Sequence, residues 1–271
     1  MKKKQMLFIL VVLITVISGV LFYKVYNYRY VDFKDEYIEE QTKKILKKNK
    51  KKVLKTELEG VKTFEIDTTF THIKSLEDLK KFPNLSNLEI LFTVDFNSGE
   101  EREDFKNLAS KSEKLHQRDQ QMLAYTLPKL DKLEKIFLGS GVVCYNLDAL
   151  KNCHQIEELW IPSNFIENIN GIQEMNNLRI LDLRDNLFKD ISPLKDLNNL
   201  EALNLSNVTI ENLEILLEVP TLKVIVYNKI ENEQQENILR QLEEQGVIVV
   251  RKEIKNFSAL LDKIGIEKVD S

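Results

Sequence analysis

Apolar residues recur along the chain with a period of 22 residues between positions 150 and 228. The clearest column consists of Leu159, Leu181, Leu203 and Ile225, and a second column follows two residues later at Ile161, Leu183, Leu205 and Tyr227. A unit this short cannot bury its own apolar side chains, so neighbouring units must stack to share a core. The pattern therefore predicts a solenoid built from short strands.

The repeat is less regular on both sides of this region. Upstream, apolar residues at 127–138 and again at 79–90 follow the same spacing. Residues 97–126 between these units lack the strand pattern and favour a helical insertion or a degenerate repeat, with Phe105, Leu108, Leu115 and Met122 as its apolar positions. Downstream, residues 229–253 predict a helix that stops near Gly246 and a final strand, which together would cap the solenoid. Residues 254–271 are expected to form a short helix or a loose tail.

These columns resemble the leucine-rich repeat, in particular the short 22-residue class of bacterial internalin-like proteins. Asn164 and Asn186 stand where that repeat places asparagine, and LRILDLRDNLFKDISPLKDL at 178–197 is close to the family's repeat as it stands. The resemblance implies an α/β solenoid over residues 59–253, shaped as an arc with a parallel sheet on its concave side. Asparagine suits the end of each strand because its amide can satisfy backbone groups of the turn.

Side chains that alternate with the core columns should lie on the concave side. If Leu159 and Ile161 point inward, Glu158 and Trp160 point outward. Across the aligned units, the residue between the two inward positions is Glu89, Phe137, Trp160, Asp182, Asn204 and Val226. Phe137 and Trp160 are thus expected to be exposed neighbours.

Two interpretations of this aromatic pair remain open. Together with Glu158, Asp182 and Arg184, it has the character of an anchor for a protein partner. Alternatively, Phe137 and Trp160 pack on each other as a cross-strand pair beneath the inserted helix.

An uncharged apolar run at residues 6–23 follows a Lys-rich leader at residues 1–5. Its length is sufficient to span a bilayer as one helix, which predicts an uncleaved transmembrane signal anchor. A cleaved signal peptide is the alternative. A Lys-rich leader usually remains cytoplasmic, so we expect a single-pass protein of the cell membrane with the bulk of the chain extracytoplasmic.

Charge is distributed unevenly along the chain. Residues 1–55 contain 14 Lys and Arg against 5 Asp and Glu, a net charge of +9, whereas the remainder contains 25 against 38, a net charge of −13. The segment 24–58 is predicted to be a Lys-rich juxtamembrane stalk. Its candidate contacts to anionic lipid or cell-wall polymer are Lys47, Lys48, Lys50, Lys51 and Lys52, although a solvated stalk explains the same residues. Nucleic acid is a poor partner because the block lacks interleaved aromatic residues and the folded part is acidic.

Catalytic patterns are scarce in this sequence. The three histidines, His72, His116 and His154, have no paired zinc-binding spacing, and there is no CxxC, GxGxxG, phosphate-binding loop or GxSxG. Cys153 occupies a core column, which predicts a buried thiol rather than a nucleophile, with a disulfide to Cys144 as an alternative.

The sequence thus predicts a protein without enzymatic activity, cofactor or metal. Its expected function is to hold a protein partner on the concave sheet at the outer side of the cytoplasmic membrane. The alternative is an envelope scaffold or spacer whose Lys-rich stalk binds anionic lipid or wall polymer.

Overall fold

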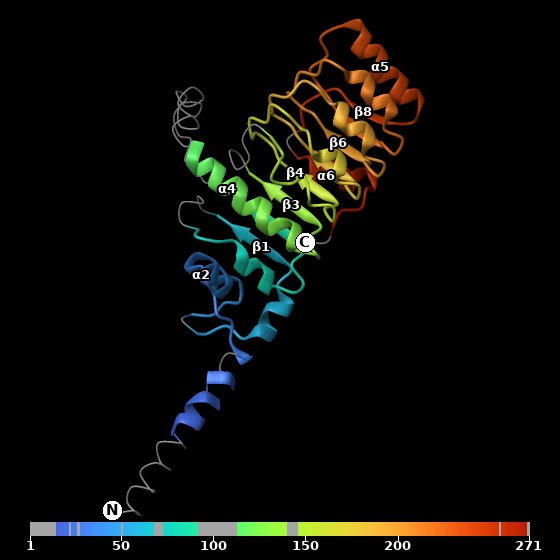
Figure 1. The fold of residues 1–271 in the computed structure, drawn as a ribbon. Coiled ribbons are helices and arrows are strands. Elements are labelled where there is room, and N and C mark those ends of the chain that lie inside the picture. Colours follow the sequence, from blue (N-terminus) through green and yellow to red (C-terminus); the bar gives the residue numbers. More distant parts are fainter. Residues whose placement is uncertain are drawn as a thin grey trace, which may run out of the picture.

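Eight short strands form one parallel sheet in the order β1 to β8, so each strand pairs with the next along the chain (Figure 1). The computed structural model describes residues 15–21, 23–25, 28–49, 51–67, 73–91, 113–139, 146–254 and 256–269. The strands are β1 (Thr63–Ile66), β2 (Asn87–Ile90), β3 (Lys135–Leu138), β4 (Glu158–Trp160), β5 (Ile180–Asp182), β6 (Ala202–Asn204), β7 (Val224–Val226) and β8 (Ile248–Val250).

The repeat columns set the register of this sheet. Leu159 of β4 pairs with Leu181, which pairs with Leu203, which in turn pairs with Ile225. All four side chains are buried in one cluster that runs through the stacked units and is called the solenoid core below. Each such burial is worth about 1.5–3 kcal/mol of transfer free energy, and stacking is what supplies it.

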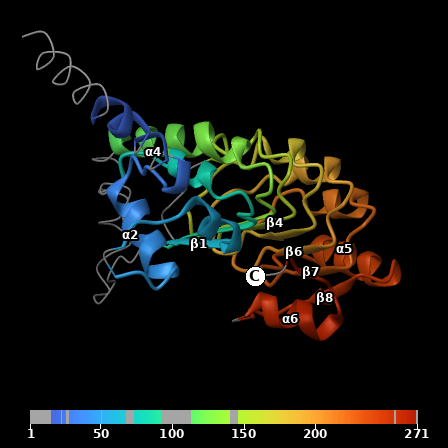
Figure 2. The same ribbon diagram turned by 90° about the horizontal axis from the view of Figure 1, so that it is seen from below.

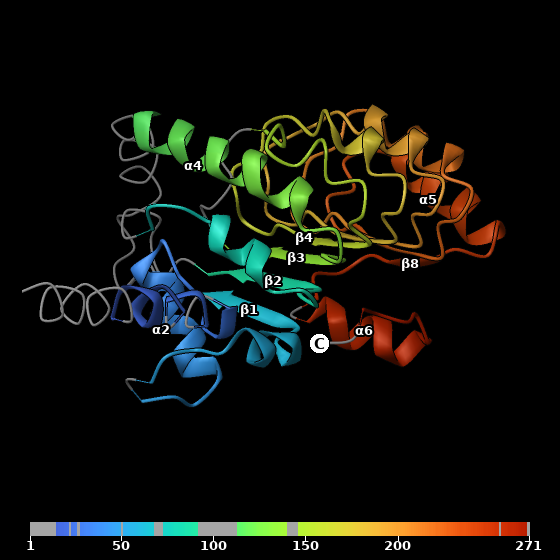
Figure 3. The same ribbon diagram turned by 60° about the horizontal axis from the view of Figure 1, so that its bottom comes forward.

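Helical segments close the solenoid on the side opposite the sheet (Figure 3). A 3-10 helix, η1 (Lys55–Gly60), precedes β1. Further short 3-10 helices return the chain between strands: η3 (Glu77–Lys81), η4 (Leu127–Lys129), η5 (Ile172–Glu174), η6 (Ser192–Asp196) and η7 (Leu213–Glu218). Two longer helices, α4 (Glu113–Thr126) and α5 (Glu233–Glu244), lie on the same side.

Helix α4 falls within the region predicted as a helical insertion. Leu123 is buried in the solenoid core and Met122 packs against it. Phe105 and Leu108 lie outside the described residues, as does the side chain of Leu115.

Asparagine side chains close the turns after β4 and β5, as the sequence predicts. The Asn186 amide donates to the carbonyl oxygens of Ile161 and Leu183, both at 2.9 Å. Its oxygen accepts the backbone N–H groups of Asn164 at 3.1 Å and Ile166 at 3.0 Å. One buried amide therefore satisfies backbone groups of two adjacent repeats, which ties the turns together.

The predicted Lys-rich stalk differs from the structure, which folds most of it onto the first repeat. Helix α2 (Glu36–Ile45) lies in this segment, and Ile38, Val53 and Leu58 are buried in the solenoid core. These three apolar positions are hard to recognise in the sequence because abundant lysines surround them. Residues 31–49 and 51–58 therefore cap the first strand rather than separate the solenoid from the N-terminus.

Two aspartates connect this cap to the first repeat. Asp35 caps α2 by accepting the Ile38 N–H at 3.1 Å, and its other oxygen accepts the Lys74 N–H at 2.6 Å. Asp78 in turn accepts the backbone N–H groups of Lys34 and Asp35, both at 2.7 Å. The buried carboxylates thus join segments about 40 residues apart in sequence.

The apolar run at residues 6–23 falls largely on residues that the structure does not describe. Residues 15–21 and 23–25 are helical. Within the described part of the chain, no helix is both long enough and apolar enough to cross a membrane.

The C-terminal end of the chain crosses to the other face of the sheet. The helix before Gly246 is α5, and the strand that follows it is β8, paired with β7. Residues Phe257–Ile264 then form α6, which lies against the sheet on the side opposite α4 (Figures 2 and 3). The segment predicted as a short helix or loose tail therefore covers the sheet face that the sequence assigns to the concave side.

Candidate functional site

The outward side chains of the strands form one continuous row across the sheet. Glu89, Phe137, Trp160, Asp182, Asn204 and Val226 stand opposite one another on successive strands, in the order that the repeat alignment predicts. Trp160 is separate from the solenoid core, while Leu159 and Ile161 belong to it. We call the side of the sheet that carries this row the concave face.

Trp160 is buried on the concave face because α6 covers it. Only 6% of the residue is exposed, and its ring meets that of Phe257 edge to face, with centroids 5.6 Å apart. The prediction that the Trp160 ring is exposed is therefore wrong. The prediction that Trp160 lies on the side of the sheet opposite the solenoid core is correct. Phe137 is half-buried and packs against the same apolar cluster.

Helix α6 rests on an apolar patch that the sequence analysis missed. Ile180 pairs with Ala202, which in turn pairs with Val224, and each precedes a leucine or isoleucine of the solenoid core. All three side chains are buried together with Phe257 and Leu261 of α6. Two features of the sequence indicate this packing: an apolar row on a sheet face that was expected to be solvated, and apolar residues four positions apart in the C-terminal tail.

Glu158 is a buried carboxylate at the edge of this patch. It accepts the indole N–H of Trp160 at 3.0 Å and lies 3.4 Å from the ammonium of Lys135. Its second oxygen accepts the backbone N–H of Val269. A buried carboxylate needs such partners, and here they include the segment that follows α6.

Asp182 and Arg184 form an ion pair beside the same patch. The guanidinium lies 2.9 Å from the carboxylate, and Asp182 is fully buried. Burial raises the pKa of Asp182 to about 6, although Arg184 acts in the opposite direction. Ser206 and Asn204 continue this polar row, with the Ser206 hydroxyl donating to the side-chain oxygen Oδ1 of Asn204 at 2.7 Å.

A cavity of about 210 Å³ opens where the N-terminal end of α6 meets the concave face. Its lining combines side chains from β2, β3, β4 and the turn after β5 with the start of α6: Glu89, Lys135, Phe137, Trp160, Arg184, Asn256, Phe257 and Ser258. The start of α6 is fixed by Asn256, whose side chain accepts the Ala259 N–H at 2.9 Å. Three of the five predicted partner-binding residues, Phe137, Trp160 and Arg184, therefore line one cavity. The other two, Glu158 and Asp182, form ion pairs with the lining residues Lys135 and Arg184.

Neither a protein-family model nor a curated protein sequence matches this chain significantly. Among solved structures, the chain is similar to internalin C2 from Listeria monocytogenes, with a TM-score of 0.53 and 21% sequence identity over 84% of this chain and 89% of that one. This likeness agrees with the parallel sheet and the buried asparagine turns. The chain has the leucine-rich-repeat fold.

Two further solved structures are similar to this chain with lower scores. An internalin, inlF, from the same species has a TM-score of 0.43 and 17% identity, over 85% of this chain and 73% of that one. A leucine-rich-repeat protein from Leptospira interrogans has a TM-score of 0.42 and 15% identity, over 71% of this chain and 49% of that one.

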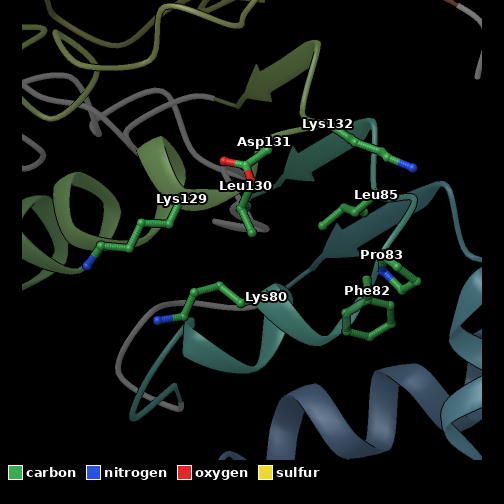
Figure 4. Close-up of a pocket in the computed structure, with 8 residues that line it drawn as sticks. All are labelled: Lys80, Phe82, Pro83, Leu85, Lys129, Leu130, Asp131 and Lys132. Atoms are coloured by element: carbon green, nitrogen blue, oxygen red, sulfur yellow. The ribbon is translucent and has the colours of Figure 1, made fainter.

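A second cavity, of about 170 Å³, lies between the helical turns of two successive leucine-rich repeats (Figure 4). Leu85 and Leu130 border it together with three lysines. Each lysine has a partner in the protein: Lys80 lies 3.1 Å from Glu77, Lys132 donates to Asn84 at 2.7 Å, and Lys129 lies over the Tyr125 ring. The lysines therefore already have contacts that an anion would have to replace.

The predicted polyanion-binding lysines lie between α2 and η1. Lys47, Lys51 and Lys52 are exposed, and Lys48 forms an ion pair with Glu57 at 2.5 Å. Lys50 lies outside the described residues.

Cys153 and His154 do not form a nucleophilic pair in this leucine-rich-repeat fold. Cys153 is a free, buried thiol in the solenoid core, and burial raises its pKa to about 12. The Nδ1 atom of His154 lies 2.8 Å from the Glu174 carbonyl oxygen instead. Among the described residues, no group of three or more His, Cys, Asp or Glu side chains is arranged to hold a metal ion.

Proposed function

We propose that this leucine-rich-repeat protein is a non-enzymatic binding module that holds a protein partner on its concave face. The observation that carries this proposal is the cavity of about 210 Å³ at the start of α6. It gathers two aromatic rings and two cations from β3, β4 and the turn after β5, and it stays open beside a helix that fills the rest of the patch. Buried aromatic and arginine side chains are typical anchors of protein interfaces.

Phe137 is the residue in this cavity that a partner would contact most directly. Unlike Trp160, it is only half-buried, so a docked side chain would remove more of its surface from water. Lys135 at the start of β3 and Arg184 in the turn after β5 offer charged contacts at the rim. Their carboxylate partners, Glu158 and Asp182, hold both cations in place.

The proposal includes a place in the cell, for which the sequence supplies the support. The apolar run at residues 6–23 would anchor the chain in the cytoplasmic membrane, with the repeats on the outer side. Protease treatment of intact cells and of lysed cells distinguishes the orientations. Digestion of the repeats only after lysis would contradict an outward orientation, and recovery in the soluble fraction would contradict an anchor.

Site-specific photo-crosslinking tests the binding face. A photoreactive phenylalanine analogue replaces Phe137 in the full-length chain, and a matched variant carries it at Lys195, an exposed residue of η6 on the opposite side. The proposal expects the probe at position 137, but not at position 195, to capture one defined protein, with the crosslink mapped by mass spectrometry. Capture from position 195 alone, or equal capture from both, would place the partner elsewhere.

A further inference from the structure

Helix α6 is amphipathic and uses one side to cover the concave face. Phe257 and Leu261, four residues apart, are buried, and Ile264 packs against the same cluster. Asp262 and Lys263 are exposed on the other side. This is the pattern of a helix that docks on an apolar surface through one stripe.

The receiving surface is separate from the solenoid core. Trp160, Ile180, Ala202, Val224 and Val226 form an apolar cluster with α6 that is distinct from the stacked leucine columns. Because the short Ala202 side chain stands between Ile180 and Val224 on adjacent strands, it leaves room for a helical side chain. The repeats thus present a complete apolar surface for a helix, and this surface, formed by Trp160, Ile180, Ala202, Val224 and Val226, is called the seat below. The repeats do not need α6 for their own stacking.

Few polar contacts attach α6 to the sheet. Arg251 is held by Glu236 and Glu243 of α5, at 3.2 and 2.6 Å, so the chain is fixed up to that point. Beyond it, in the described part of the segment, the hydrogen bond to the sheet is the one from the Val269 N–H to Glu158.

The contacts of Lys268, by comparison, stay within the segment, with Ser258 and Asp262. A helix of eight residues is also too short to persist alone in water. Its folding therefore depends on docking, and undocking returns a flexible segment to solvent.

The cavity shows that α6 does not fill its seat completely. It begins where α6 begins, next to Phe257 and Ser258, and continues over Phe137 and Lys135. A helix that started one turn earlier would occupy both the apolar patch and this cavity. Such a helix would make contacts that α6 lacks, and it would gain affinity from them.

We propose that the concave face from β4 to β7 is a binding site for an amphipathic helix, and that α6 is its displaceable occupant within the chain. The partner is then a protein that inserts a helix with an aromatic residue against Trp160 and an aliphatic residue one turn later, over Ile180 and Ala202. This inference rests on the proposed function and specifies the partner's recognition element. Binding of a helix in a groove through residues at such spacing is an established mode of recognition.

A synthetic peptide with the sequence of residues 252–269, labelled with a fluorophore, tests the site directly. It is added to the full-length wild-type protein and to a full-length variant with Phe257→Ala and Leu261→Ala, in which α6 is released. Anisotropy measures binding, and the emission of Trp160, the single tryptophan of the chain, reports coverage of the seat. A peptide with serine at positions 257 and 261 is the matched control.

The proposal predicts saturable binding to the released variant, about tenfold or more tighter than to the wild type, because α6 occupies the seat in the wild type. Trp160 emission should shift back to the wild-type wavelength, and the serine peptide should not bind. If circular dichroism shows that the double variant is unfolded, the wild type at higher peptide concentration replaces it, with anisotropy of the labelled peptide as the measurement of binding. Absence of peptide binding to a folded protein, or binding to the released variant that leaves its Trp160 emission unchanged, overturns the proposal.

The two proposals fail separately. Peptide binding without any capture from position 137 would keep the helix site but remove the proposed partner. Capture from position 137 without peptide exchange would keep the partner and show that α6 is a permanent part of the fold.

Discussion

The ring of Phe257 packs edge to face on the indole of Trp160, at a centroid distance of 5.6 Å and an interplanar angle of 62°. These residues lie far apart in the sequence, and the contact joins the C-terminal segment to the fourth strand. Glu158 strengthens the connection, because it accepts both the Trp160 indole N–H and the Val269 backbone N–H. Trp160 is therefore the centre of an interface within the chain, on the face where the repeat pattern places it.

Substitutions in the two apolar clusters should have different effects. Leu203→Ala removes a side chain from the solenoid core and should lower the free energy of unfolding by about 2–5 kcal/mol, measured by urea titration. Leu261→Ala lies in the α6 cluster, so it should mainly accelerate hydrogen exchange in residues 257–264 while the repeats keep most of their stability. An equal loss of global stability in both variants would show that α6 folds as one unit with the repeats.

Replacing the asparagine at the turn after β5 should be costly despite its small size. Asn186→Ala leaves buried N–H groups of Asn164 and Ile166 without their acceptor, and each unsatisfied group costs about 1–3 kcal/mol. We expect a loss of about 2–4 kcal/mol in thermal or urea unfolding. Asn198→Ala, at an exposed site, is the control and should change stability little. Equal effects would mean that water satisfies the turn.

Asp182 should make stability depend on pH between 4 and 7. Because its pKa in the folded protein, about 6, lies above the usual value of 3.8, the protonated carboxyl favours the fold at low pH, and this contribution is lost as the pH rises through 6. Between pH 4 and pH 7, the free energy of unfolding of the wild type should therefore fall by up to about 3 kcal/mol relative to that of Asp182→Asn, measured by urea titration at each pH. Exposed Asp196→Asn controls for net charge. A constant difference between Asp182→Asn and wild type across this range would contradict the assignment.

Cys153 should be unreactive in the native protein. Burial raises the pKa of its thiol to about 12, so the thiolate that attacks alkylating reagents is scarce at pH 8. Iodoacetamide followed by peptide mass spectrometry should label Cys153 only after denaturation. Rapid labelling of Cys153 in the folded protein would indicate that this repeat opens readily.

The repeat period was sufficient to predict the sheet and its outward row. Columns 22 residues apart leave one register in which Leu159, Leu181 and Leu203 share a core, since a shift by one residue would turn every leucine outward. The same alternation placed Phe137 beside Trp160, and the two are paired in the structure. The spacing of apolar residues within neighbouring repeats is enough to predict the strand pairing, because each repeat contacts only its neighbours.

The docking of α6 on the concave face depends on contacts between residues far apart in the sequence, which the spacing within a repeat does not predict. Phe257 and Leu261 have helical spacing, but so would a loose amphipathic tail. Only their combination with an apolar row on the outward side, Ile180, Ala202 and Val224, points to docking. The N-terminal cap was missed for a similar reason, since abundant lysines surround the few apolar residues that enter the core.

Fluorescence of Trp160 in the full-length protein measures directly whether α6 covers the concave face. We expect a blue-shifted emission and weak quenching by acrylamide in the wild type, and a red shift with stronger quenching in Phe257→Ala, while circular dichroism of the repeats stays the same. Emission and quenching like those of free tryptophan in the wild type would contradict the covered face. A buried indole that Phe257→Ala leaves unchanged would place Trp160 in the solenoid core, and the proposed binding face would then be wrong.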